Sequence, residues 1–111
     1  MMLTIGLGFR ADVSEDNYTL DVHMLRQPGT QLFIASNKWD SLVIKSLDGI
    51  DKSHVRALPI ACSNIKIDFD IELDEKLLQI LCTLYPGKAG RIRKCFLLKG
   101  DIKEILNECP A

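Results

Sequence analysis

The clearest structural signal in the chain is residues 65–73, which read Ile-Lys-Ile-Asp-Phe-Asp-Ile-Glu-Leu. Every second side chain in this stretch is apolar and every side chain between is charged, which is the period of a β-strand with one buried and one solvated face. One solvated face is typical of antiparallel sheets, because helices usually cover both faces of a parallel sheet. The stretch therefore predicts a mainly antiparallel sheet.

The same two-residue period recurs upstream of residue 65. Pro28 and Gly29 predict a type II turn between two of these stretches, since proline presets φ for the second turn position and glycine accepts a positive φ at the third. One stretch is less regular, because Pro59 cannot donate to a strand ladder. The expected strands are residues 3–9, 18–24, 30–36, 41–47, 53–60 and 65–73, which gives five to six strands within residues 2–73.

After residue 74 the apolar period becomes that of a helix. Asp74 is a favourable N-cap, and Pro86 ends the run of apolar residues that follows it. Residues 91–98 fit a strand or a helix, and their spacing favours the helix. A further short helix is expected from Asp101, with Ile102, Ile105, Leu106 and Cys109 on its buried side. Strands followed by two or three short C-terminal helices predict an α+β fold, with the helices packed on one face of the sheet.

The composition predicts one ordinary globular domain, residues 1–111. Hydrophobic residues make up 47% of the chain, which is enough for a core, and 26% of residues are charged with nearly balanced signs, which excludes the composition of a disordered tail. No apolar run approaches the roughly 20 residues of a membrane span. The N-terminus lacks the basic region and cleavage site of a secretory signal, so we expect a cytoplasmic protein.

The four cysteines lack the spacing of a zinc site, so we expect reduced thiols and no metal, although an exported chain would permit two disulfides. Catalytic residues are not expected either. The chain has only two histidines, and neither forms a recognisable Cys-His or Ser-His-Asp arrangement with other residues. No cofactor is implied.

The charge is unevenly distributed along the chain, although the net charge is only −1. Residues 1–75 contain 7 basic and 12 acidic side chains, whereas residues 76–111 contain 7 basic and 3 acidic ones. Asp68, Asp70 and Glu72 would project from the same face of the expected strand, roughly 6.5 to 7 Å apart. This acidic face is either a solvated surface or a docking site for a basic partner. Trp39, in a turn between strands, either covers the core or anchors that interface.

The opposite charge is concentrated in residues 88–99. Basic side chains are expected to contact phosphates, with Lys88, Arg91, Arg93 and Lys94 as the candidates. However, no aromatic residues for base stacking are interleaved except Phe96, so a solvated helix face is the competing interpretation.

These observations favour a small non-enzymatic protein-binding module. Its most concrete form is an immunity- or antitoxin-type inhibitor, in which Asp68, Asp70 and Glu72 neutralise a basic nuclease toxin by mimicking its phosphate substrate. One alternative is a nucleic-acid-binding or regulatory protein that uses residues 88–99. A second alternative is an enzyme with a metal bound by Asp68 and Asp70.

Overall fold

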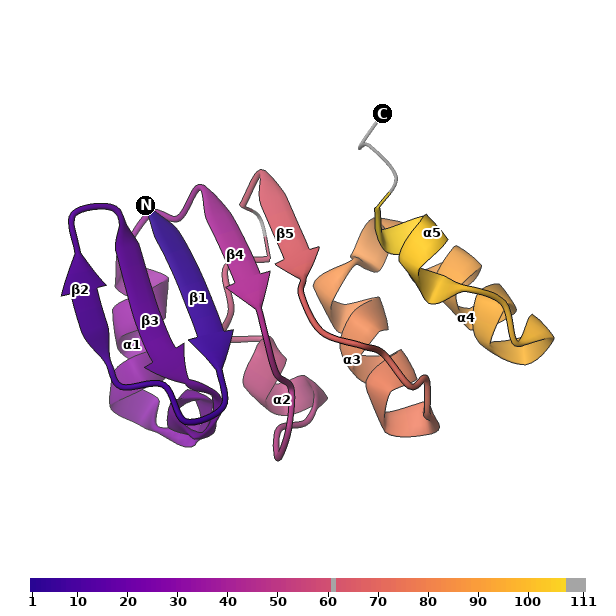
Figure 1. The fold of residues 1–111 in the computed structure, drawn as a ribbon, viewed down its shortest axis with the longest axis horizontal. Coiled ribbons are helices and arrows are strands. Elements are labelled where there is room, and N and C mark those ends of the chain that lie inside the picture. The colour runs from indigo at the N-terminus through magenta and orange to yellow at the C-terminus, as the bar shows by residue number, and fades with distance from the viewer. Residues whose placement is uncertain (61, 108–111) are drawn as a thin grey trace. The chain divides into compact units, whose positions relative to one another are not determined.

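The computed structural model describes residues 1–60 and 62–107 (Figure 1). Contacts within the chain divide it into two compact units, residues 1–70 and residues 71–111. The strands found in the described residues all belong to the first unit, and the second is helical. We call them the sheet unit and the helical unit. The expectation of a single domain stays a prediction.

The sheet unit contains a five-stranded sheet in the order β2-β3-β1-β4-β5. Strands β3, β1, β4 and β5 are parallel, and only β2 runs antiparallel to its neighbour β3. The elements in chain order are β1 (Met2–Gly6), β2 (Asp12–Ser14), β3 (Asn17–Asp21), the 3-10 helix η1 (Val22–Arg26), α1 (Pro28–Ser36), β4 (Ser41–Ile44), α2 (Lys52–Val55) and β5 (Asn64–Ile67).

The prediction of a mainly antiparallel sheet is therefore wrong. The crossovers through α1 and through α2 run in the same direction across the sheet, and right-handed crossovers then place both helices on one face. Figure 1 shows α1 behind the strands. Because the described helices of this unit cover one face only, a parallel sheet acquires the alternation that usually indicates an antiparallel one. The alternation of apolar and polar side chains indicates which face of a sheet is buried. It does not indicate whether neighbouring strands are parallel or antiparallel.

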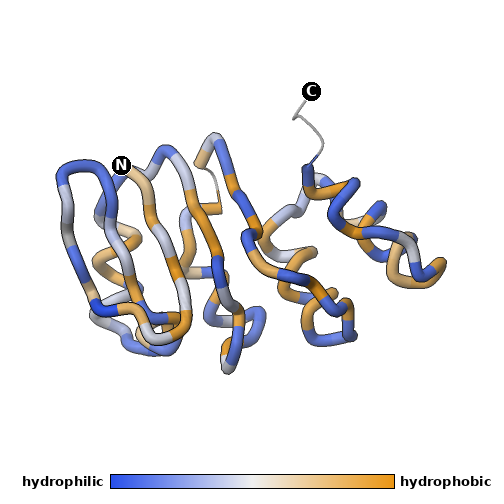
Figure 2. The backbone as a smooth tube through the Cα atoms, in the orientation of Figure 1, coloured by the Kyte–Doolittle hydropathy of each residue, from blue (hydrophilic) through white to orange (hydrophobic). Residues whose placement is uncertain are grey.

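The register shows how the two faces differ. Parallel partners point to the same side, so the row through Ile5 is apolar and the next row, through Thr4, is mainly polar. The apolar row is Leu20, Ile5, Ile44 and Ile67, and the polar row is Thr19, Thr4, Val43 and Lys66. Figure 2 shows a separate contrast along the chain, because the turn between β2 and β3 is hydrophilic and the middle of β4 is hydrophobic.

Three of the expected strands are wholly or partly helical. Residues 30–36 belong to α1, residues 22–24 to η1, and residues 53–55 to α2. The predicted turn at Pro28 is wrong, because Pro28 is the first residue of α1. Proline is well suited to that position, since its φ is already helical and the N–H that it lacks would have no partner in the first turn. The α2 helix begins at an Asp51 N-cap, which the strand prediction overlooked.

The predicted strand at residues 65–73 is correct only in its first half. The ladder of β5 ends at Ile67, and the last backbone bond to β4 runs from the Asp68 N–H to the Ile44 carbonyl, at 2.8 Å. Exposed and half-buried residues nevertheless continue to alternate through Leu73. The pattern therefore predicted the exposure correctly and overestimated the length of the strand.

The core of the sheet unit lies between the apolar face of the sheet and its helices. Leu3 and Leu42 at the centre of the sheet are completely buried, as are Leu25 of η1 and Val55 of α2. An aromatic cluster extends this core, with ring centroids of Tyr18, Phe33 and Trp39 separated by 4.6 to 6.0 Å. These contacts hold the connection between α1 and β4, in which Trp39 lies, against Phe33 of α1 and Tyr18 of β3.

The helical unit comprises α3 (Glu75–Leu84), the 3-10 turn η2 (Pro86–Lys88), α4 (Ala89–Leu98) and α5 (Ile102–Leu106). The structure confirms the helix after Asp74, whose carboxylate accepts the Leu77 N–H at 2.7 Å. It also confirms the helical interpretation of residues 91–98 and the Asp101 cap, which accepts the Lys103 N–H at 3.0 Å. Cys109, placed on the last helix by its sequence spacing, lies outside the described residues. The packing of these helices on the sheet stays a prediction.

Candidate functional sites

Residues 68–75 form what we call the acidic segment, with five carboxylates and no basic side chain. Asp68, Asp70 and Glu72 are all exposed, as both interpretations of this segment, a docking site and a solvated surface, predicted. They do not lie on a strand face, however, because β5 ends before them. Asp68 lies 3.7 Å from the Lys45 ammonium, and both side chains are about half exposed. A surface ion pair of this kind contributes little to stability.

The other two carboxylates of the acidic segment have a structural role. Asp74 is the N-cap of α3 and Glu75 lies in its first turn. Negative charge there stabilises a helix, because the first-turn N–H groups carry partial positive charge. Only the first three carboxylates are therefore candidates for binding a partner.

The charge asymmetry also belongs largely to the acidic segment. Residues 1–70 contain 7 basic and 9 acidic side chains, a net charge of −2, and residues 71–111 contain 7 basic and 6 acidic ones, a net charge of +1. Counted by unit, the asymmetry is much smaller than the sequence split at residue 75 indicated. A charged partner is therefore expected to bind at residues 68–72, and not to recognise the net charge of either unit.

The predicted nucleic-acid contacts lie on or next to α4. Arg91, Arg93 and Lys94 are exposed, and we call them the basic face. Lys88 has a different role, since its ammonium donates to the Ile105 carbonyl at 3.0 Å and lies 5.7 Å from the centre of the Tyr85 ring. This bond satisfies a carbonyl at the end of α5 and gives Lys88 a structural function.

Two leucines of α4, which the sequence analysis did not single out, share the exposed side of this helix. Leu97 and Leu98 are 78% and 71% exposed. They follow Arg93 and Lys94 by four residues, the spacing that places side chains on the same side of a helix. That spacing was visible in the sequence, and it extends the exposed surface of α4 beyond its cations.

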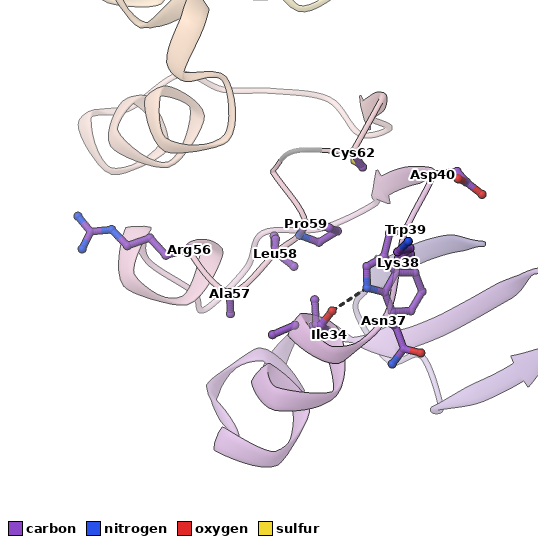
Figure 3. A pocket seen from close by; sticks show the side chains of 11 residues that line it. Ile34, Asn37, Lys38, Trp39, Asp40, Arg56, Ala57, Leu58, Pro59 and Cys62 are labelled. Carbon is purple, nitrogen blue, oxygen red and sulfur yellow. Dashed lines mark hydrogen bonds between the residues drawn. The ribbon is translucent and has the colours of Figure 1, made fainter.

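Trp39 was proposed as a partner contact, and its environment favours the core interpretation. Its side chain is 8% exposed, and its indole N–H donates to the Ile34 carbonyl at 2.8 Å. One side of it nevertheless lines a pocket of about 560 Å³ in the sheet unit, which we call the Trp39 pocket (Figure 3). Sequence periodicity could not reveal this pocket, because its walls come from separate segments. The lining residues are Ile34, Ala35, Asn37, Lys38, Trp39, Asp40, Arg56, Ala57, Leu58, Pro59 and Cys62.

The carboxyl ends of the parallel strands contain a second group of polar residues. Gly8, in the loop after β1, has a φ of 77° and donates its N–H to the carboxylate of Asp21 at the end of β3, at 2.9 Å. Ligands of parallel sheets bind at this edge in general. Here the Asp21 carboxylate fixes the glycine turn. The sequence analysis missed Asp21 because it did not predict the strand direction.

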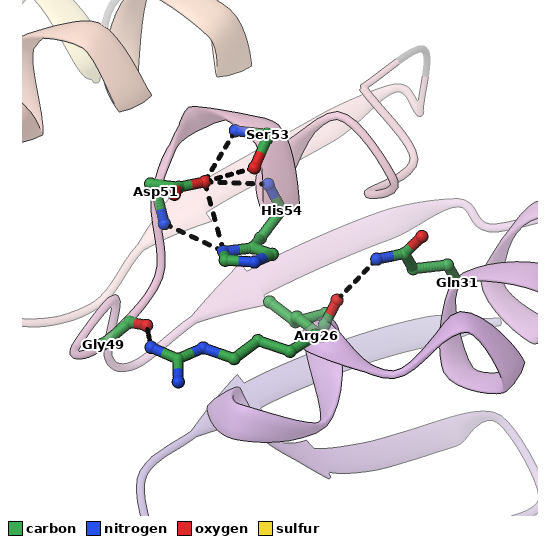
Figure 4. A network of polar contacts seen from close by, with 7 residues as sticks. Arg26, Gln31, Gly49, Asp51, Ser53 and His54 are labelled. Carbon is green, nitrogen blue, oxygen red and sulfur yellow. Dashed lines mark hydrogen bonds and ion pairs between the residues drawn. The ribbon is translucent and has the colours of Figure 1, made fainter.

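Ser53, His54 and Asp51 lie together at the start of α2 without forming a catalytic triad (Figure 4). The Ser53 hydroxyl donates to Asp51, not to His54, so no base is placed to activate it. Asp51 also accepts the backbone N–H of Ser53 at 2.9 Å. The hydrogen bond from the Ser53 hydroxyl is the main reason that the pKa of Asp51 lies below its usual value. The group is a helix cap.

A metal site is also absent from the described residues. In residues 1–60 and 62–107, no group of three or more His, Cys, Asp or Glu side chains could bind a metal ion. The hypothesis of an enzyme with a metal bound by Asp68 and Asp70 therefore stays a prediction, with no third side-chain ligand found beside them in those ranges. Cys62, Cys82 and Cys95 are free thiols, and Cys109 lies outside the described residues. None of the helices in the described ranges is both long and apolar enough to span a bilayer.

No family model matches the chain, and no curated protein or solved structure matches it.

Proposed function

We propose that the chain is a non-enzymatic protein-binding module whose acidic segment binds a basic surface of a partner protein. In its most specific form it is an immunity- or antitoxin-type inhibitor, located in the cytoplasm, that occupies the phosphate-binding surface of a basic nuclease. The main support is the alternation in residues 68–73, where three exposed carboxylates alternate with three half-buried apolar side chains. A partner would thus meet three exposed carboxylates within five consecutive residues of the chain.

The weak pairing of Asp68 also supports this function. The 3.7 Å contact between Lys45 and Asp68 joins two half-exposed side chains, so a partner cation can replace Lys45 at small cost. Complementary charges of this kind accelerate association and select the partner more than they raise affinity. The three free thiols are consistent with a reducing compartment.

The test is reversal of the three carboxylates, Asp68→Lys, Asp70→Lys and Glu72→Lys, in one variant. Binding to a panel of immobilised basic nucleases, with inhibition of their activity as a second readout, should weaken by about tenfold or more at low salt. The matched control reverses Asp12, Glu15 and Asp16, which are also exposed and give the same change in net charge. If both variants lose binding equally, net charge alone explains the effect and the assignment to residues 68–72 is wrong. Unchanged binding in the first variant, or no nuclease bound by the wild type, would also contradict the proposal.

A second candidate function is nucleic-acid binding through the basic face. The observation that favours it is the exposure of Arg93 and Lys94 on a helix whose opposite side, at Ile92 and Cys95, is buried. A regular helix can present such cations to successive phosphates of a nucleic acid.

Fluorescence anisotropy with a labelled DNA duplex and a labelled RNA hairpin tests this candidate. If three phosphates are contacted, affinity should fall about 40-fold between about 50 and 200 mM salt. Arg91→Glu, Arg93→Glu and Lys94→Glu together should abolish binding. The matched control reverses Arg10, Lys52 and Lys66, which are exposed and lie in the sheet unit. This control variant should keep most of the binding to nucleic acid. Equal loss in the two variants would reject the basic face.

A further inference from the structure

The Trp39 pocket lies wholly within the sheet unit and is independent of the acidic segment. Its walls come from the end of α1, the connection to β4, and the residues that follow α2. Its volume of about 560 Å³ is within the range of sites that bind small molecules.

The polar groups in the walls are already satisfied by the protein itself. The Trp39 indole N–H donates to the Ile34 carbonyl at 2.8 Å, and the Asn37 amide N–H donates to the Phe33 carbonyl at 2.8 Å. The Cys62 thiol donates to the Asn64 carbonyl at 3.3 Å, and burial raises the pKa of this thiol, so it brings no negative charge. The remaining wall is apolar, formed largely by Ile34, Ala35, Ala57, Leu58 and Pro59. A ligand would therefore gain most by burying an apolar body here.

The charged residues at the pocket are two cations and one carboxylate. Asp40 pairs with the amino group of Met1, which compensates its charge. The side chains of Lys38 and Arg56 are exposed, and within residues 1–60 and 62–107 neither forms a hydrogen bond or ion pair. In Figure 3 the Arg56 guanidinium points away from the pocket, whereas Lys38 lies on the same side as Trp39. Lys38 is thus the cation placed to meet a negative group of a ligand, and Arg56 adds to the positive potential.

We propose that the Trp39 pocket binds a small molecule with an apolar ring system and one negative charge, an aromatic carboxylate or sulfonate. The ring system lies against Trp39 and Leu58, and the anionic group lies beside the Lys38 ammonium. This combination of an apolar wall and a few placed polar groups is the general design of a small-molecule site.

Trp39 is the only tryptophan of the chain, so its fluorescence reports directly on this pocket. The probe is anilinonaphthalene sulfonate, an aromatic anion that accepts excitation energy from tryptophan, and the uncharged comparison is N-phenylnaphthylamine. The sulfonate should quench Trp39 saturably at one site, and the uncharged compound should bind at least about tenfold more weakly, because it lacks the Lys38 contact.

Two variants and one control separate the site from general adsorption. Lys38→Glu should weaken sulfonate binding by about tenfold or more and leave the uncharged compound unaffected. Ala35→Phe, an exposed position on α1 that lines the pocket, should fill it and weaken both probes, with the circular dichroism spectrum unchanged. Lys52→Glu makes the same charge change on α2 away from the lining residues and should have no effect. The proposal is overturned if the wild type shows no saturable quenching, if both probes bind equally, or if Lys38→Glu and Lys52→Glu behave alike.

Discussion

The two units of the chain differ in how far local sequence determines their structure. In the helical unit, α3 and α5 begin at capping carboxylates, Asp74 and Asp101, and the three described α-helices were expected, although the short 3-10 helix η2 was not. In the sheet unit, the strand direction and three of the expected elements differ from the prediction. The difference arises because a helix satisfies its hydrogen bonds within about four residues, whereas a strand finds its partner far along the chain.

The same difference predicts where substitutions act. In the sheet unit the decisive variable is which face of the sheet a residue occupies, and adjacent residues of one strand should differ sharply. In the helical unit the decisive variable is the position within a helix, and a single cap should matter. Three experiments examine these expectations.

The largest effect is expected at Leu42, at the centre of β4 and completely buried on the helix-covered face. Leu42→Ala should lower the free energy of unfolding by about 2 to 5 kcal/mol, because it removes apolar contacts and leaves a cavity. The neighbouring Val43 points to the other face and is half-buried, so Val43→Ala should cost about 1 kcal/mol or less. Urea unfolding followed by Trp39 fluorescence measures both. Similar losses in the two variants would contradict the assignment of Leu42 to the face covered by α1 and α2 and of Val43 to the opposite face.

A smaller effect is expected at the N-cap of α3. Asp74→Ala should destabilise this helix by about 1 kcal/mol, because the Leu77 N–H loses its acceptor. Glu72→Ala removes a nearby exposed carboxylate that caps no helix, and serves as the matched control. Helix content followed by circular dichroism during urea unfolding gives the comparison. The expected result is an earlier transition for Asp74→Ala alone, and coincident transitions would show that the cap contributes nothing measurable.

Some parts of the fold could be predicted because single residues mark the ends of helices, and other parts could not because their residues suit two structures equally well. Asp74, Pro86 and Asp101 mark helix ends by short-range chemistry, and all three were interpreted correctly. Residues 30–36 contain apolar side chains that suit either a strand or a helix, and Pro28 is equally suited to a turn and to a first helical position. Strand direction depends on long-range pairing, which periodicity does not encode.

At the candidate sites, too, the sequence predicted features that depend on neighbouring residues and missed those that depend on long-range contacts. Exposure of the acidic segment and of the basic face was predictable from charge and period. The structural role of Lys88 was not, because its acceptor, the Ile105 carbonyl, lies 17 residues away. The Trp39 pocket was not predictable either, since it forms only when the end of α1 meets the residues that follow α2.

The smallest effect is expected at Asp51, which caps α2 in the sheet unit as Asp74 caps α3. Hydrogen bonds, chiefly from the Ser53 hydroxyl, hold its pKa below the value in the unfolded chain. A lowered pKa stabilises the fold while the carboxyl is ionised. The contribution should therefore be constant above about pH 5 and decline as the pH falls through about 4 and below. Asp51→Asn keeps a capping oxygen without the charge. The urea midpoint of the wild type, followed by Trp39 fluorescence, should exceed that of this variant at pH 7 and converge with it in acid. A difference that persists at the lowest pH would show that the charge of Asp51 is not its source.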